Sequence, residues 1–222
     1  MSIISLKSVR YAYRNKYQSV QALKDINCTF EQGVMYAIIG KSGSGKSTML
    51  SLMAGLDLPD EGDVLFQGTS TRTLNLDTFR RNDVAMIYQS FRLFPLLTAL
   101  ENVMYPMELH GLRPRDAKKR AEEYIRSVDL TDVVFNRFPS MLSGGEQQRI
   151  AIARALAMDT GIILADEPTG NLDSVTSRNI MTLLAQLAHE RNYCVVVVTH
   201  DTGVLDLTDV TYQMRDGILV KE

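Results

Sequence analysis

The chain has 222 residues, of which 45% are hydrophobic, and its 24 basic and 26 acidic side chains give a formal net charge of −2. This length allows one domain, or one domain with an added lobe, and the apolar content is ample for a sizeable core. The balance of charge argues against a protein that relies on a broad basic face, so we expect no nucleic-acid partner.

The two cysteines, Cys28 and Cys194, lie in apolar, strand-like runs and predict buried thiols in a reducing compartment rather than a metal site. No secretory signal is visible at the N-terminus. The most apolar run, Val195 to Val198, is far shorter than the roughly 20 residues that a membrane helix needs. If the protein works at a membrane, another chain must cross it.

The first part of the chain predicts strands before any helix. An apolar run predicts a buried strand at 35–39, and a helix follows the glycine-rich loop after it. Three strands ahead of the first helix indicate an antiparallel β layer attached to an α/β core. The other elements expected here are strands at 3–12 and 20–30, a short strand pair around 62–68, a helix at 77–82 and a strand at 83–89.

The second part predicts a helical lobe over 98–157, in which Pro106 and Pro114 punctuate the first half. The expected elements after the lobe are a strand at 161–166, a helix at 174–191, a strand at 193–199 and a hairpin at 209–221 with Asp216-Gly217 as its turn. We therefore expect one domain over 1–222. Its core and β subdomain comprise 1–97 and 158–222, and the lobe comprises 98–157.

The stretch YAIIGKSGSGKST contains the spacing G-x-x-x-x-G-K-[ST] of a phosphate-binding loop. Glycines let triphosphate oxygens approach the backbone, whose N–H groups and the following helix N-terminus bind anions. Lys46 would reach the β- and γ-phosphates, and Ser47 would ligate Mg²⁺. An ordinary glycine-rich turn is the alternative, which the flanking strand and helix disfavour. The expected nucleotide-binding residues are Gly40, Lys41, Ser42, Gly43, Ser44, Gly45, Lys46, Ser47 and Thr48.

The strand IILADEP ends in two carboxylates, Asp166 and Glu167. Beside a phosphate loop, Asp166 would hold the Mg²⁺ shell, and Glu167 would be the general base that orients and polarises the attacking water. The alternative is a solvated loop that happens to contain two acids.

The run LSGGEQQR places Ser143, Gly144 and Gly145 before a helix, which makes a second anion-binding terminus in the chain. A capping box between Ser143 and Glu146 would explain this locally. It leaves the two glycines unexplained.

Together these patterns closely resemble the nucleotide-binding subunit of an ABC transporter. The motifs of that family occur here in the same order: GKSGSGKST, a loop at Gln89, LSGGEQQR, IILADEP, GNLD and His200. The resemblance implies a P-loop NTPase (RecA-like) α/β core with an antiparallel β subdomain and an inserted α-helical subdomain. It also implies an ATP hydrolase that uses ATP and Mg²⁺. Two copies pair head to tail, so that ATP lies between the phosphate loop of one and Ser143, Gly144 and Gly145 of the other.

The resemblance also assigns roles to single residues. Tyr13 matches the aromatic that stacks on adenine, with Tyr11 the weaker candidate. Gln89 senses Mg²⁺ and the γ-phosphate, and His200 contacts the γ-phosphate and supports the geometry of the water. Asp173 lies in a loop that crosses the dimer seam.

DEPTGNLD and LTALENV resemble the MacB-type, LolD-type and FtsE-type branch of the family. This implies an ATPase at the cytoplasmic face of the membrane that drives export or extraction of lipophilic or peptide-like cargo through a separate permease. FRLFPLLTAL is either the docking surface for that permease or lobe core. The alternatives are an FtsE-like regulatory cassette that moves no cargo and, less favoured, an ABC ATPase of translation or DNA repair.

Overall fold

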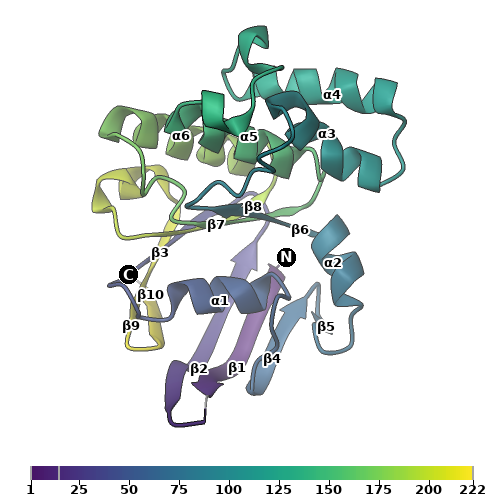
Figure 1. Ribbon diagram of the computed structural model, residues 1–222. Helices are drawn as coiled ribbons and strands as arrows, with labels where there is room; N and C mark the ends of the chain where they lie inside the picture. The colour runs from purple at the N-terminus through teal and green to yellow at the C-terminus, as the bar shows by residue number, and fades with distance from the viewer. Residues whose placement is uncertain (1, 15, 222) are drawn as a thin grey trace.

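The computed structural model describes residues 2–14 and 16–221. Over these ranges the chain forms a central sheet, a second sheet below it and a group of helices above it (Figure 1). A single short helix lies between the two sheets. The fold is the α/β architecture with an antiparallel layer that the sequence predicts.

The central sheet has the strand order β10-β9-β3-β8-β7-β6. All neighbouring pairs are parallel except β9 and β10, which form the expected C-terminal hairpin at the edge of this sheet. Asp216 and Gly217 both have positive φ in its turn. The strands are β3 (Met35–Ile39), β6 (Val84–Tyr88), β7 (Ile162–Asp166), β8 (Cys194–Thr199), β9 (Val210–Arg215) and β10 (Ile218–Lys221).

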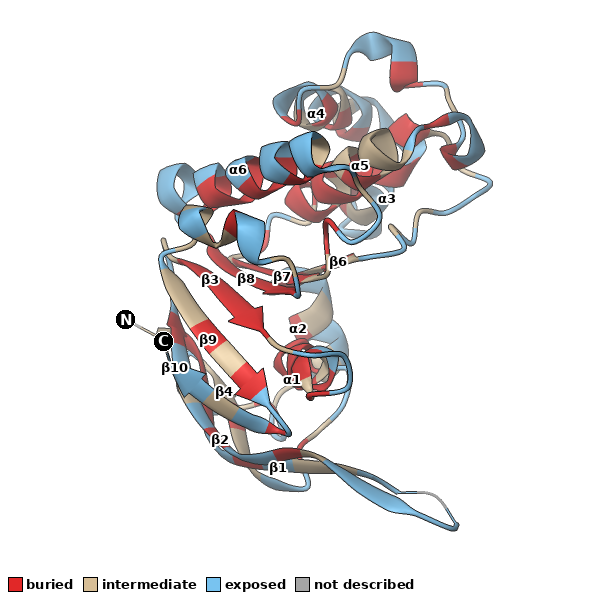
Figure 2. Cartoon of the chain, turned by 90° about the vertical axis from the view of Figure 1, so that its left-hand side faces the viewer, coloured by how far each residue is buried: buried red, intermediate tan, exposed pale blue. Residues whose placement is uncertain are grey.

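The lower sheet is antiparallel and has the order β2-β1-β4-β5. Its long hairpin β1–β2 extends beyond the body of the molecule and is exposed at its tip (Figure 2). Helix α1 (Lys46–Met53) lies between the two sheets. The strands are β1 (Ser2–Arg14), β2 (Ser19–Glu31), β4 (Glu61–Phe66) and β5 (Thr69–Ser70).

The remaining α-helices are α2 (Leu76–Asn82), α3 (Ala99–Leu109), α4 (Pro114–Ser127), α5 (Gly144–Leu156) and α6 (Ser174–Arg191), and the 3-10 helices are η1 (Asp132–Val134), η2 (Pro139–Met141) and η3 (Thr202–Leu207). The expectation that Pro106 interrupts this region is wrong, because Pro106 lies inside α3. It removes one backbone hydrogen bond close to the end of the helix, and the helix continues for three more residues. Pro114 is the first residue of α4, where the missing N–H has no intrahelical partner in any case.

The inner strands β3, β7 and β8 of the central sheet are buried on both faces, which explains why they are continuous apolar runs. Met35, Val195 and Val197 pack with α3, α5 and α6 on the upper face. Ile38 and Val196 pack with α1 and the antiparallel sheet on the lower face. Cys28 and Cys194 are free thiols. Cys194 is buried in the lower core, as expected, whereas Cys28 is only partly buried and packs against that core.

Ile38 tests how much the lower core stabilises the fold. Its side chain is fully buried in the central strand β3. We expect Ile38→Ala to lower the free energy of unfolding by about 2–5 kcal/mol, because it leaves a cavity that the close-packed core fills only in part. Urea unfolding measures this. Ile218→Ala, at a half-exposed position on the edge strand β10, is the control and should change stability by about 0.5 kcal/mol or less. Equal losses would contradict the placement of Ile38.

Candidate functional site

The loop between β3 and α1 is fixed by close contacts with two neighbouring strands. A Cβ on Gly40 would lie 2.3 Å from the carbonyl oxygen of Met214, and one on Gly45 would lie 2.5 Å from that of Ala22. Both glycines have positive φ. A side chain at either position would collide with backbone, so the spacing of the glycines is set by how tightly the loop packs against β9 and β2.

The inside of this loop fits a triphosphate. Lys46 is buried, and its Nζ donates to the carbonyls of Gly40 at 2.9 Å and Lys41 at 3.0 Å. Ser44 Oγ is also buried and has no hydrogen-bond partner among the described residues. The first turn of α1 contains no acid, so its N-terminal partial charge stays positive. A buried ammonium, a free hydroxyl and a helix N-terminus are the groups that anionic oxygens satisfy.

The two tyrosines of β1 have different environments. Tyr11 donates its hydroxyl to the carboxylate of Asp57. Tyr13 is half exposed, and its hydroxyl lies 3.1 Å from Thr48 Oγ1. It lines a cleft of about 240 Å³ together with Val20 and the phosphate loop. Tyr13, rather than Tyr11, therefore has a ring positioned for a base beside the phosphates.

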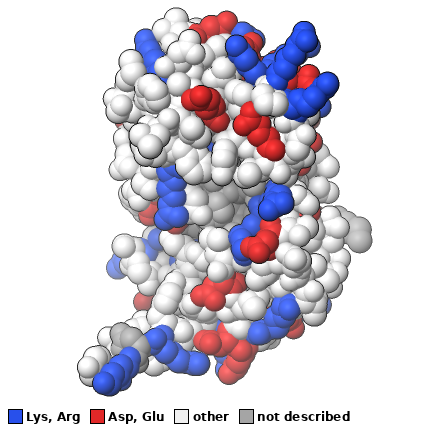
Figure 3. All heavy atoms as spheres, turned by 45° about the vertical axis from the view of Figure 1, so that its right-hand side comes forward, with Lys and Arg blue, Asp and Glu red and all other residues white. Residues whose placement is uncertain are grey.

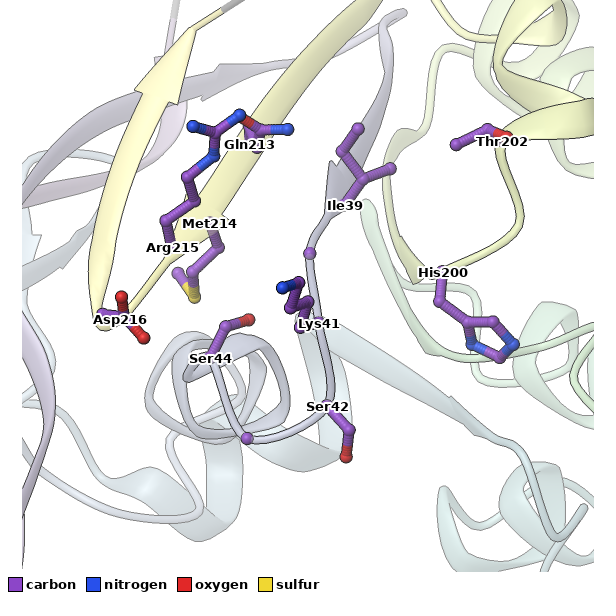
Figure 4. Close-up of a pocket in the computed structure, with 12 residues that line it drawn as sticks. Ile39, Lys41, Ser42, Ser44, His200, Thr202, Gln213, Met214, Arg215 and Asp216 are labelled. Carbon is purple, nitrogen blue, oxygen red and sulfur yellow. The ribbon is translucent and has the colours of Figure 1, made fainter.

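A second and larger hollow, of about 720 Å³, lies on the other side of the phosphate loop. Figure 4 shows the loop running between His200 on one side and the β9–β10 hairpin on the other. Lys41 and Ser42 are exposed on this loop, together with Gly43. The phosphate loop is thus open to solvent along its outer edge.

The carboxyl end of β7 meets the start of α1. Ser47 Oγ donates to Asp166 Oδ1 at 2.9 Å, so the two residues expected to hold a cation are already in contact. Burial raises the pKa of Asp166, and the Glu167 carboxylate raises it further, while the Ser47 hydrogen bond opposes the shift. Hydroxyl and carboxylate oxygens are the ligands that Mg²⁺ prefers, and it takes few of them from the protein.

Glu167 has a left-handed backbone, with φ of 47°. Its amide donates to the carbonyl of Val198 at 2.9 Å, which fixes the turn after β7. Its Oε2 lies 3.1 Å from Nδ1 of His200, which follows β8. Strained backbone of this kind persists where the surroundings hold it and is concentrated at functional sites.

Gln89 follows β6 and reaches the same edge of the sheet. A Cβ on Gly170 would lie 2.6 Å from Gln89 Nε2 and 3.3 Å from Glu167 Oε2, so the amide and the carboxylate both border Gly170. Asn171 Nδ2 donates to the backbone carbonyl of Gln89 at 3.1 Å. The structure therefore brings Gln89, Glu167 and His200 together from three neighbouring strands.

Ser143, Gly144 and Gly145, which we call the signature segment, begin α5. Ser143 and Glu146 form the predicted capping box. The glycines face the start of α6, since a Cβ on Gly144 would lie 3.5 Å from Leu172 in the preceding loop and one on Gly145 2.9 Å from Thr176 in its first turn. Figure 1 shows α5 above the central sheet and α1 below it. One chain therefore places its signature segment and its phosphate loop on different parts of the molecule.

Asp173 caps α6 within its own chain. Its carboxylate accepts from the amides of Val175 and Thr176 and from the Thr176 hydroxyl at 2.6 Å, which lowers its pKa. Within one chain the carboxylate therefore accepts from three donors. The expected contact of Asp173 across a dimer seam stays a prediction.

The sequence patterns did not predict a role for Asn171, Asn102 or Arg154. Each makes side-chain hydrogen bonds to the backbone of residues 89–98, which we call the Gln89 loop. A signal was present for two of them. Asn102 and Arg154 are polar residues within the apolar helical runs ALENV and AIARALA.

The chain is similar to known proteins over most of its length. The ABC transporter family model matches residues 23–170. A dimeric post-hydrolysis structure of the Methanocaldococcus jannaschii cassette MJ0796, bound to ADP and Pi, superposes with a TM-score of 0.92. It is 41% identical and the match covers 99% of this chain and 97% of that one.

Two relatives have named transport roles. The lipoprotein-releasing system ATP-binding protein LolD of Saccharophagus degradans is 38% identical over 223 residues, covering 99% of this chain and 97% of LolD. The methionine import ATP-binding protein MetN 2 of Enterococcus faecalis is 43% identical over 226 residues, covering 100% of this chain and 65% of MetN 2. The chain therefore belongs to the ABC transporter family and is one of its ATP-hydrolysing cassettes.

Proposed function

We propose that this cassette hydrolyses ATP as a head-to-tail homodimer and drives export or extraction of lipophilic or peptide-like cargo, such as a lipoprotein, through a separate membrane permease. The observation that carries the proposal is a row of exposed apolar side chains on and beside the Gln89 loop. The likeness to LolD supports the class of cargo. The likeness to MetN 2, a methionine import protein, makes import the alternative that the transport assay below tests.

The pairing follows from the separation of the two anion sites. The phosphate loop would hold one side of a triphosphate, and its outer edge is open. The signature segment presents an exposed Ser143 and two half-buried glycines at the N-terminus of α5. A second copy, turned head to tail, would bring that helix N-terminus to the open edge, where its N–H groups stabilise phosphate charge.

Within each site we assign Mg²⁺ to the oxygens of Ser47, Asp166 and Gln89. The cation supplies charge that balances the phosphates and the two acids. Tyr13 stacks on the base, and Lys46 binds the phosphates. Asp173 and the signature segment belong to the shared seam.

Glu167 would accept a proton from the attacking water, because its carboxylate lies at the sheet edge that faces the phosphate loop. His200, 3.1 Å from that carboxylate, orients it and reaches toward the γ-phosphate. The apolar strands β7 and β8 hold both residues, so the pair needs no rearrangement of the core.

The docking face for the permease consists of Phe94 and Leu96 on the Gln89 loop and Tyr105 and Leu109 on α3. They are 41%, 87%, 39% and 55% exposed. The rings of Phe94 and Tyr105 lie 4.8 Å apart, which joins the loop to the helix. Adjacent exposed apolar side chains of this kind mark interaction sites. Leu93, by contrast, packs against the helical core.

Over the described residues, no helix is both long enough and apolar enough to span a bilayer. From the likeness to LolD and the exposed docking face, we place the cassette at the cytoplasmic face of a membrane, held there by its permease. Figure 3 shows a hollow between the helical half and the sheet half of the molecule, with acidic and basic side chains interspersed on this face. We divide the chain into a lobe of 98–157 and a core of 1–97 and 158–222, and α6 of this core packs with α3 and α5 of the lobe on the upper face of the sheet.

Asp166→Asn tests the cation site through the pH dependence of stability. Because the pKa of Asp166 is raised on folding, the folded chain binds this proton more tightly, and stability falls as pH rises from 3.8 through the raised value. We expect Asp166→Asn to raise Tm by a few degrees at neutral pH without nucleotide. The gain should shrink toward pH 4.

The same variant should lose the stabilisation that Mg²⁺ and ATP give the parent chain. Asp132→Asn is the matched control, because Arg126 lowers the pKa of that exposed acid and its removal should not raise Tm. A gain in Tm that is the same at all pH values, or unchanged stabilisation by Mg²⁺ and ATP, would contradict the assignment.

Glu167→Gln tests the shared site. We expect it to bind ATP, lose turnover by a factor of about 10² or more and elute as a dimer with ATP on size exclusion, because the bound triphosphate is no longer consumed. Adding Ser143→Arg should abolish the dimer but leave ATP binding intact, since the signature segment acts on the other copy. If Glu167→Gln stays monomeric with ATP, the head-to-tail proposal is wrong.

Leu96→Asp tests the docking face and the transport role. A carboxylate buried in an apolar interface costs several kcal/mol, so co-purification with the permease and permease-stimulated ATP hydrolysis should fall about tenfold or more. Val133→Asp, which changes another exposed apolar residue of the helical lobe, should preserve both. Equal effects of the two variants would refute the docking face. Release of lipoprotein from vesicles by the parent complex separates extraction from import and from a regulatory role.

A further inference from the structure

The Gln89 loop contains two consecutive residues in an unfavourable backbone conformation. Phe91 and Arg92 have φ of 58° and 45°, and neither is a glycine. Left-handed residues of this kind cost of order 1 kcal/mol or more each and persist only where the surroundings hold them. Gln89, whose amide borders Gly170 as the Glu167 carboxylate does, lies two residues before Phe91.

Arg154, in the last turn of α5, binds the backbone carbonyls of Phe91 and Arg92. Its Nη1 donates to the oxygen of Arg92 at 2.7 Å, and its Nη2 donates to that of Phe91 at 3.2 Å. The guanidinium makes no ion pair with any acid of the described ranges. Its planar fork matches two adjacent carbonyls, which the single ammonium of lysine cannot do.

Aromatic contacts extend this attachment along the loop. The Arg154 guanidinium lies 5.7 Å from the ring centre of Phe94, and that of Arg92 lies 3.9 Å from the ring centre of Tyr88. Cation–π contacts at these distances add to the hydrogen bonds. Desolvation lowers the pKa of Arg154, yet arginine remains charged at any physiological pH.

Asn102 of α3 secures the far end of the loop. Its side chain is fully buried, accepts from the amide of Phe94 at 2.8 Å and donates to the carbonyls of Phe94, Leu97 and Thr98 at 2.9–3.1 Å. The segment from 91 to 98 is therefore a preformed element held at both ends. Only Gln89 and Ser90 lie between it and β6.

We propose that Arg154 is a positioning residue for ATP hydrolysis, which fixes the Gln89 loop and ties it to the helix that begins with the signature segment. Residues 144 and 154 stand about 15 Å apart on one rigid helix. A displacement of the loop is then a displacement of the signature segment. The idea that permease docking acts through this connection rests on the proposed function above. The role of Arg154 in placing Gln89 does not rest on it.

Arg154→Lys tests the placement in the isolated cassette, without a permease. We expect kcat to fall about fivefold or more while KM for ATP changes by about twofold or less, because Tyr13 and the phosphate loop are untouched. Hydrogen exchange should speed up at residues 90–97. Arg149→Lys is the matched control, since Arg149 lies on the same helix and donates to the carbonyl of Val128 at 2.8 Å, away from the Gln89 loop.

The control variant Arg149→Lys should leave kcat unchanged and speed hydrogen exchange near residues 126–131 instead.

The double change Phe91→Gly and Arg92→Gly supplies a second test, because glycine adopts positive φ without strain. In that background Arg154→Lys should cost less activity than in the parent chain. The failure of a transport assay would not bear on these results.

Unchanged kcat in Arg154→Lys, or the same exchange map for both lysine variants, would overturn the proposal. If Arg154→Lys does not fold, Arg154→Gln, which keeps one donor, takes its place. Failure of both to fold while Arg149→Lys folds would show that Arg154 serves the whole fold, and would overturn the proposal as well.

Discussion

The parallel pairing of β3, β8, β7 and β6 is the constraint on which the site depends, because it makes four chain segments emerge at one edge of the sheet. The phosphate loop follows β3, His200 follows β8, Glu167 follows β7 and Gln89 follows β6. The strands themselves contain almost no polar side chain and are covered on both faces by core. Apolar burial therefore provides the position, and the residues just past the strand ends provide the chemistry.

The same edge accumulates features that do not stabilise the free chain. Two adjacent carboxylates lie close together, Glu167 has a left-handed backbone, and Ser44 has a buried hydroxyl without a partner. A cation would balance the two carboxylates, and a triphosphate would accept a hydrogen bond from the Ser44 hydroxyl. This is the pattern expected where a protein gives up local stability at a binding site and recovers it on ligation.

Sequence patterns predicted the strands and the hairpin turn well, because each depends on neighbours along the chain. They also singled out Gln89, Glu167 and His200, which the structure brings to one edge of the sheet. Apolar runs define buried strands, and glycine spacing defines a loop that must approach backbone. Pro106 was misjudged because the cost of proline depends on how near the helix end lies. Arg154 and Asn102 were missed because a polar residue in an apolar helix shows no partner in the sequence. The carbonyl that Arg154 binds lies 62 residues away.

A mechanical link between the docking face and the nucleotide needs an element that moves as a unit, because a soft segment would absorb the displacement. The Gln89 loop meets this requirement, since Asn102 and Arg154 hold its backbone from two different helices. Coupling between sites is a difference in free energy, typically 1–3 kcal/mol, and it acts in both directions. A partner that displaces the loop would thus change where the signature segment lies. By the same connection, a nucleotide that draws in the signature segment of the other copy would move the docking face.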